Sequence, residues 1–334
     1  MPPETAVMPA PSAAARLPEA WRAPLVALAA AALVLVSVTA EAWGDMFHQW
    51  WNIDTYNHLL LVPFITAWLV ALKERELAAL HPQPFAPGLI PVAAALGLWW
   101  AGQVMGINLL AQAGAVGALQ AAAVTILGLR VSLLLALPIA FVAFMVPFGD
   151  EIIAPLQFLT ADMAIALTHA SGIPARIEGI HIHTPAGLFI VAEACSGVKF
   201  LIAMVTLGVL VAFTRFTRWS RRAALLIACV IVPILANGVR AWATIYVAQF
   251  IGAERATGFD HIVYGWVFFA VITAVLLGAA WRFVEREPEA YGWTAAEIAC
   301  RPVVASAEAF AFAPRSAAFA ITALAAIAAI AVLV

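Results

Sequence analysis

Three short polar blocks, each at the end of a long apolar run, carry the residues that could do chemistry. They span 192–197, 236–240 and 258–261, and they contain Cys195, Arg240 and His261. Cysteine is a nucleophile that a nearby histidine can activate or assist. A guanidinium can stabilise the negative charge that develops on a carbonyl oxygen. The combination predicts covalent acyl transfer, provided that the fold brings the three blocks together.

Cys195 precedes an apolar run that begins near residue 198, so we expect it at the N-terminus of a helix. The helix dipole and Lys199, four residues on, would both favour a thiolate there. The alternative is a small buried side chain that only packs. Packing is the interpretation for Cys229, which has no polar neighbours in its run, and Cys300 has no base near it in the sequence.

Arg240 is costly to bury in lipid, which indicates a function or a partner. It is expected to clamp a substrate carbonyl, supported by Asn237 one helical turn earlier. The alternative is that it reaches the membrane surface or pairs with Glu193 or Asp260. Asp260 would cap the helix that follows it.

Other histidines compete with His261 for the role of base. His181 and His183 alternate along one strand face, where a metal site lacks a third ligand in register. His58 opens the second apolar run and is expected near the same cavity. We therefore predict catalysis by Cys195, Arg240 and His261 without metal or organic cofactor, supported by residues that position groups or bind substrate: Glu193, Ser196, Asn237, Asp260 and His58.

The composition requires lipid as the solvent of this chain. Of its 334 residues, 65% are hydrophobic and 11% charged, with a mean hydropathy of +0.98. Soluble domains carry about 25% charged residues. A net charge of -2 says little about partners, whereas the lack of a basic patch argues against a nucleic-acid partner.

We predict an all-α polytopic membrane protein with about eight or nine spanning helices. Residues 1–23 are expected to be a disordered cytoplasmic terminus, and 152–170 an interfacial or re-entrant helix. The candidate spans, each near the roughly 20 residues that a bilayer requires, are 24–43, 57–72, 88–105, 108–128, 131–147, 198–214, 223–248, 262–281 and 317–334.

The distribution of Lys and Arg predicts the orientation. With the N-terminus inside, 13 of the 17 Lys and Arg residues fall on the inner side. Residues 148–197 then form an outer segment, in which the alternating run 177–183 predicts a strand that pairs with 188–192. Residues 286–316 become a cytoplasmic loop before the last span, 317–334.

Together the motifs resemble those of the exosortases, multi-pass bacterial membrane enzymes. The resemblance covers about residues 25–285, here taken as a catalytic domain over 24–285, and is closest to the exosortase A type, which is linked to exopolysaccharide production. It rests on Glu193-Ala194-Cys195-Ser196-Gly197, Asn237-Gly238-Val239-Arg240, Asp260-His261 and the early run Tyr56-Asn57-His58.

The resemblance implies a cysteine transpeptidase of the inner membrane whose site faces the periplasm. Its partners would be membrane lipid, secreted proteins with a C-terminal PEP-CTERM tail, and an acceptor nucleophile of unknown nature. Two alternatives stay open. A transporter or flippase for polyprenyl-linked exopolysaccharide would place charges across the whole membrane depth, and a non-catalytic assembly scaffold would not need Cys195.

Overall fold

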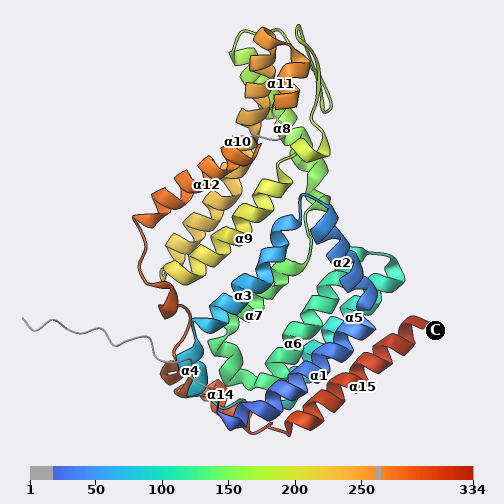
Figure 1. Cartoon of the computed structure of the whole chain (residues 1–334), viewed down its shortest axis with the longest axis vertical. Helices are drawn as coiled ribbons and strands as arrows, with labels where there is room; N and C mark the ends of the chain where they lie inside the picture. Colours follow the sequence, from blue (N-terminus) through green and yellow to red (C-terminus); the bar gives the residue numbers. More distant parts are fainter. Residues whose placement is uncertain (1–17, 260–264, 334) are drawn as a thin grey trace, which may run out of the picture. The chain divides into compact units, whose positions relative to one another are not determined.

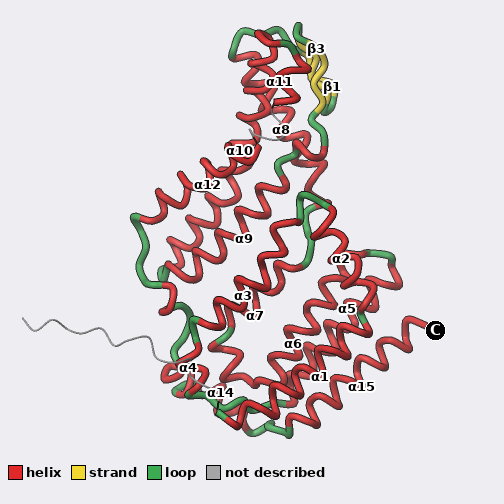
Figure 2. Tube along the Cα trace, viewed as in Figure 1, coloured by secondary structure: helices red, strands yellow, loops and turns green. Residues whose placement is uncertain are grey.

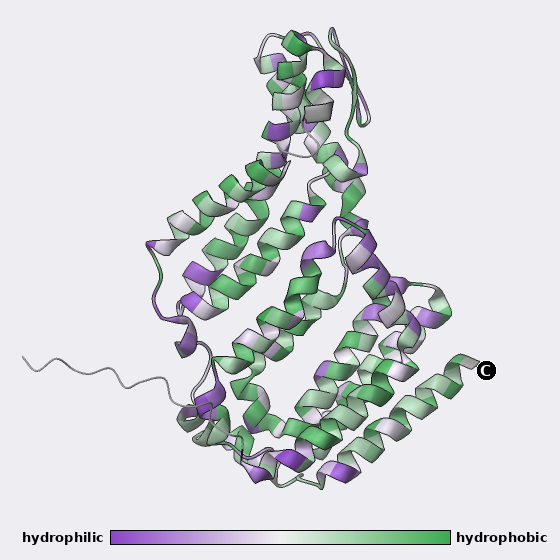
Figure 3. Ribbon diagram, in the orientation of Figure 1, coloured by the Kyte–Doolittle hydropathy of each residue, from purple (hydrophilic) through white to green (hydrophobic). Residues whose placement is uncertain are grey.

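The computed structural model describes residues 18–259 and 265–333 and divides the chain into two compact units (Figure 1). The first unit comprises residues 1–44, 63–143 and 292–334, and the second 45–62 and 144–291. Within the described residues, seven helices are long and apolar enough to cross a membrane, or eight if one sharply bent pair counts as a span. Hydrophobic residues cover these long helices (Figure 3), which confirms the all-α polytopic fold.

The first unit is a helical bundle assembled from both ends of the chain. Its core joins α1 to α15 and to the α5 and α6 pair through small and branched side chains such as Ala31, Leu35, Ala122 and Ile321, all fully buried. Its elements are η1 (Glu19–Trp21), α1 (Arg22–Val38), the first part of α2 (Ala40–Asn52), most of α3 (Val62–Ala71), α4 (Glu74–Ala78), η3 (Ala86–Gly88), α5 (Leu89–Met105), α6 (Asn108–Leu134), α7 (Ala136–Phe141), part of η4 (Val142–Met145), α13 (Ala295–Ala299), α14 (Pro302–Glu308) and α15 (Pro314–Leu333).

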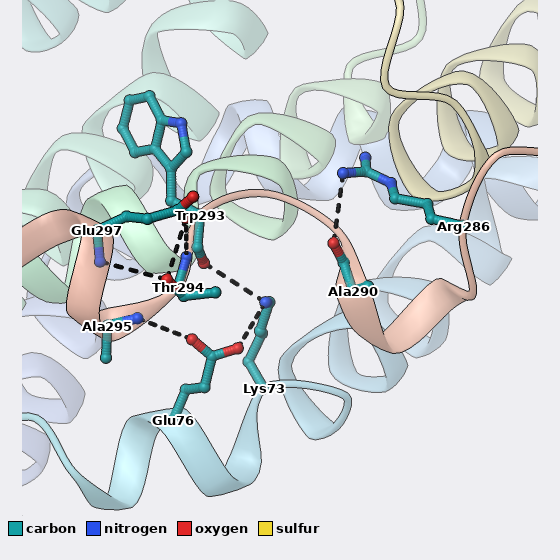
Figure 4. A network of polar contacts seen from close by, with 8 residues as sticks. All are labelled: Lys73, Glu76, Arg286, Ala290, Trp293, Thr294, Ala295 and Glu297. Atoms are coloured by element: carbon teal, nitrogen blue, oxygen red, sulfur yellow. Dashed lines mark hydrogen bonds and ion pairs between the residues drawn. The ribbon is translucent and has the colours of Figure 1, made fainter.

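A buried lysine holds the C-terminal helices of this unit to its N-terminal part (Figure 4). Lys73 is 1% exposed and donates to Glu76 Oε1 at 2.8 Å and to the carbonyl of Trp293 at 3.5 Å. The other oxygen of Glu76 accepts from the N–H of Ala295 at 2.8 Å. Because Lys73 is buried with a charged partner, the contact offsets its desolvation and ties α4 to the start of α13.

The second unit contains the polar blocks and the small sheet. Its long helices α9, α10 and α12 pack through Met204, Ala212 and Cys229 against Phe269 and its neighbours. Its elements are η2 (Asn57–Leu61), α8 (Asp150–Ala170), β1 (Arg176–Glu178), β2 (His181–Thr184), β3 (Gly187–Ile190), η5 (Glu193–Cys195), α9 (Val198–Arg215), α10 (Trp219–Ile251), α11 (Ala253–Phe259), α12 (Gly265–Trp281) and η7 (Pro288–Ala290).

The three antiparallel strands lie in the order β1-β2-β3 beside α8 and α11 (Figure 2). Ile182 and Phe189 face inward and pack on Ala161 of α8 and Ile245 of α10. The predicted pairing with 188–192 is confirmed, with the paired strand at Gly187–Ile190. The run 177–183 was expected as one strand, but it folds into two, because Gly179 adopts φ +63° and turns the chain between Glu178 and His181.

Three expected boundaries differ from the structure. Residues 131–147 do not form one span, because α6 ends at Leu134 and the short α7 follows, although the expected boundary after residue 128 coincides with a kink in α6 at Gly128, which has φ +79°. Residues 152–170 belong to α8, which is apolar and long enough to span. Its polar Gln157 bonds to the carbonyl of Val191 at 2.8 Å, so that side chain needs no water. Residues 1–17 lie outside the described part, whereas the chain is helical from Glu19, inside the segment expected to be disordered.

The turn between α9 and α10 is held by one carboxylate from the chain after α12. A single oxygen of Glu285 accepts from the N–H and hydroxyl of Thr217 at 2.6 and 2.7 Å and from the N–H of Arg218 at 3.0 Å. Arg218 and Arg221 also lie 3.4 and 3.1 Å from its second oxygen. These bonds, with that from the Arg218 N–H largest, lower the pKa of Glu285 from 4.5 to about 2.

Glu285→Gln should therefore lower the thermal stability of the protein in detergent at neutral pH. A depressed folded-state pKa contributes stability above the unfolded value, which is lost as pH falls from about 4.5 towards 2. The difference in Tm between wild type and variant should shrink over that window. Glu287→Gln is the matched control, since its exposed carboxylate makes a single ion pair within the described residues, 3.1 Å from Arg215. An equal effect of both substitutions at every pH would contradict this role of Glu285.

Candidate active site

Cys195 ends a short 3-10 turn rather than starting a helix. Its N–H donates to the carbonyl of Ala192 at 2.8 Å, and the N–H of Ser196 donates to the carbonyl of Glu193 at 3.0 Å. Gly197, with φ +86°, is the N-cap residue of α9. Cys195 thus lies two residues before the N-cap of α9. The N–H groups of Cys195 and Ser196 already donate to carbonyls of the turn.

Asn237 fixes this turn from α10. Its Nδ2 donates to the carbonyl of Cys195 at 2.9 Å, and its side chain is 3% exposed. A Cβ at Gly197 would lie 2.8 Å from Cγ of Asn237, so only glycine admits the amide here. The sequence suggested that Asn237 supports Arg240, whereas in the structure it contacts the backbone of Cys195. Ser196 is also buried, and its hydroxyl accepts from the N–H of Val198 at 3.4 Å.

A cavity of about 720 Å³ opens beside the turn, entirely within the second unit. Cys195 and Arg240 both line it, together with Glu193 and Ser196. Its remaining lining comes from the segment after α2, the first half of α8 and the start of α9 and α12: Ile53, Asp54, Thr55, Asp150, Ile153, Ala154, Gln157, Ala194, Gly197, Val198, Lys199, Phe200 and Gly265. The structure therefore brings the first two polar blocks to one place.

Arg240 lies in the wall of the cavity against the ring of Phe200. It is 8% exposed, and its guanidinium carbon lies 5.9 Å from the ring centroid of Phe200. Phe200 in turn stacks on Phe269 of α12 at a centroid distance of 4.7 Å. A cation over an aromatic face is stabilised by the ring quadrupole, which helps to offset the cost of burying the charge. The guanidinium is thereby placed at the cavity rather than extended to bulk solvent.

Residues 53–55 close one side of the cavity and were not identified from the sequence as part of the site, where the next residues, Tyr56-Asn57-His58, were expected instead. This segment is anchored by the hydroxyl of Tyr56, which donates to Asp150 Oδ1 at 2.5 Å, and by the Trp50 indole, which donates to the carbonyl of Met145 at 2.9 Å. Asp54 lies 3.9 Å from Lys199. No local pattern marks these residues, because their partners are about 90 or more positions away in the chain.

Of the four candidate histidines, the structure describes three. His261 and Asp260 lie outside the described residues, although Gly265, which follows four positions after His261, lines the cavity. His58 is half-buried in η2 and is not among the described residues that line it. His181 and His183 lie on β2, where they pair with Ile190 and Leu188 of β3, away from the lining.

Comparison with known proteins identifies the family. Neither the curated proteins nor the solved structures contain a match to this chain. The model of one protein family, the transmembrane exosortases of the EpsH type, matches residues 50–278, which is more than half of the sequence and includes all three polar blocks. The chain is therefore a multi-pass membrane protein that belongs to the transmembrane exosortase family.

Proposed function

We propose that this protein is a cysteine transpeptidase that cleaves the C-terminal PEP-CTERM signal of secreted proteins. The observation that carries the proposal is the shared cavity of Cys195 and Arg240. In many acyl-transfer enzymes backbone N–H groups near the nucleophile stabilise the oxyanion. Here the N–H groups of Cys195 and Ser196 are bonded to carbonyls, so a side-chain donor is needed. Arg240, with its five N–H donors, is the group at hand.

The first half-reaction forms a thioester. The thiolate of Cys195 attacks the scissile carbonyl carbon, and the C–S bond forms as the carbonyl π pair moves onto oxygen. Arg240 stabilises this oxyanion by charge-assisted hydrogen bonds. When the oxyanion collapses, the C–N bond breaks and His261, protonated, gives its proton to the leaving amine. His261 is assigned to this step on the family resemblance and on its place in the chain just before Gly265.

The second half-reaction transfers the acyl group. His261, now neutral, accepts a proton from the acceptor nucleophile as that group attacks the thioester carbonyl. Arg240 again stabilises the oxyanion, and the C–S bond breaks to release the thiolate of Cys195. Water in place of the acceptor gives hydrolysis. No step requires a metal or an organic cofactor, and the chemistry of both halves is supplied by side chains.

Cys195→Ala should abolish conversion of a tailed substrate from its full-length to its shortened form. Cys195→Ser should be nearly as inactive, because a hydroxyl is a poor nucleophile without a stronger base. The readout is the ratio of the two substrate forms in cells making each variant at equal membrane levels. Cys300→Ala is the matched control, since Cys300 is exposed and is not among the cavity-lining residues. Normal conversion by Cys195→Ala would exclude nucleophilic catalysis and favour the scaffold.

Arg240→Lys should reduce turnover by about 10²–10³-fold, the range seen when an oxyanion donor is removed. Lysine keeps the positive charge but lacks the planar set of N–H donors of a guanidinium. Its ammonium, on a flexible chain, also cannot pack against the ring of Phe200 as the guanidinium does. Arg255→Lys, an exposed position on α11, controls for loss of guanidinium in general. Unchanged turnover in Arg240→Lys, measured on purified enzyme with a tailed peptide, would return Arg240 to a purely structural role.

The site is proposed to face the periplasm, with the arginine-rich turn at 215–222 in the cytoplasm. In a chain without native cysteines, a single cysteine at Arg255 should react with an impermeant maleimide in intact spheroplasts. A cysteine at Arg218 should react only after permeabilisation. Both positions have exposed residues, so accessibility within the protein is matched. Labelling of position 218 from outside would reverse the orientation and remove the proposed site from the periplasm.

A further inference from the structure

Two buried polar side chains on different helices meet at the backbone of Cys195. Thr160 of α8 is 2% exposed and Asn237 of α10 is 3% exposed. The Nδ2 of Asn237 donates to Thr160 Oγ1 at 3.0 Å and to the carbonyl of Cys195 at 2.9 Å. Its two amide hydrogens thus have two acceptors, one that belongs to the helical frame and one that belongs to the turn bearing the nucleophile.

The carbonyl of Cys195 determines which way the Asn237 amide points, and the hydroxyl of Thr160 gives the same nitrogen a second acceptor. If the amide were rotated by half a turn, its oxygen would face the carbonyl oxygen of Cys195 and the two acceptors would repel. With Thr160 present, the nitrogen has two acceptors on the same side and the observed orientation is favoured. Without the hydroxyl of Thr160, the buried amide would lose one of its two hydrogen bonds, which is worth about 1 kcal/mol.

Gly197 allows the turn of Cys195 to pack closely against the side chain of Asn237. The amide of Asn237 occupies the space where a Cβ of residue 197 would stand, only 2.8 Å from Cγ. The turn therefore cannot move towards α10 without a clash, and it cannot move away without breaking the bond to the Cys195 carbonyl. The packing at Gly197 and the hydrogen bond from Asn237 together fix the peptide plane between Cys195 and Ser196. They thereby fix the position from which the Cys195 side chain projects.

We propose that Thr160, a residue of α8 that touches no reacting atom, is a positioning residue for Cys195 and acts through the amide of Asn237. The proposal rests on the proposed catalytic role of Cys195. Misplacing a reacting group by about 1 Å can cost up to about 10²-fold in rate. Loss of the Thr160 hydroxyl should therefore lower kcat, while the cavity that binds substrate keeps its shape and KM changes little.

The test compares Thr160→Val, which is isosteric but lacks the hydroxyl, with Thr160→Ser, which keeps an acceptor oxygen. Thr160→Val should lower kcat by about 10-fold or more with KM within about 2-fold, and Thr160→Ser should restore most of the loss. Thr168→Val is the matched control on the same helix. Thr168 is equally buried, but its hydroxyl only bonds to the carbonyl of Ala164 in its own helix, at 2.7 Å.

A second measurement reports positioning without any activity. Hydrogen exchange of the peptide 192–198 should be about 5–10-fold faster in Thr160→Val than in wild type, since a bond worth about 1 kcal/mol is lost. Exchange within the rest of α9 should not change. In an Asn237→Ala background, Thr160→Val should have no further effect, because the two residues act through one contact.

The two measurements separate the possible failures. If wild-type enzyme processes no tailed substrate but exchange follows the prediction, the proposed function fails and the positioning stands. If Thr160→Val leaves both kcat and exchange at 192–198 unchanged, Thr160 has no positioning role. Equal losses in Thr160→Ser and Thr160→Val, or in Thr168→Val, would also overturn the proposal, because they would indicate a general effect of packing in α8.

Discussion

The backbone from Val191 to Gly197 leaves the sheet through a short 3-10 turn before α9 begins, and those of its polar groups that are buried must find partners inside the protein. Side chains of two helices provide partners for two of its carbonyls. Gln157 of α8 binds the carbonyl of Val191, and Asn237 of α10 binds the carbonyl of Cys195. Apolar helices that pack against each other offer few hydrogen-bonding groups, so these amides decide where an irregular turn can exist at all. The position of the nucleophile follows from that constraint.

The same constraint explains the spacing of the second polar block. Asn237 and Arg240 are three residues apart on α10, so both project from one face of that helix. When the Asn237 amide binds the turn of Cys195, the same helical face carries the guanidinium of Arg240 to the cavity that Cys195 lines. The guanidinium then lies over the ring of Phe200, which stacks on Phe269. The Asn-x-x-Arg spacing therefore links the turn of Cys195 geometrically to the guanidinium proposed to stabilise the oxyanion.

The sequence predicted the parts of the fold that depend on apolar length and local alternation. Long runs such as those of α5, α9 and α15 were found because a helix that spans lipid must be apolar over most of its length. The break after Leu134 was missed, since an apolar run of 131–147 looks the same whether or not it is continuous. For α8 an interfacial or re-entrant helix was expected because Gln157, Asp162 and His169 interrupt it. By length and composition the helix could also cross a membrane, and Gln157 satisfies the backbone of a distant segment.

Residue types alone selected Cys195 and Arg240, because a thiol beside polar neighbours and a charge within an apolar helix are both unusual and costly. They could not select Thr160, Asp54 or Asp150. Threonine is common in apolar helices, where it bonds to its own backbone, as Thr168 does. What distinguishes Thr160 is a partner 77 positions away, and only the packing of α8 against α10 creates that pair. Residues such as Thr160, which support the site, can thus be found only from the tertiary structure. Cys195 and Arg240 can be found from the sequence, because polar residues are otherwise rare in segments that lie in lipid.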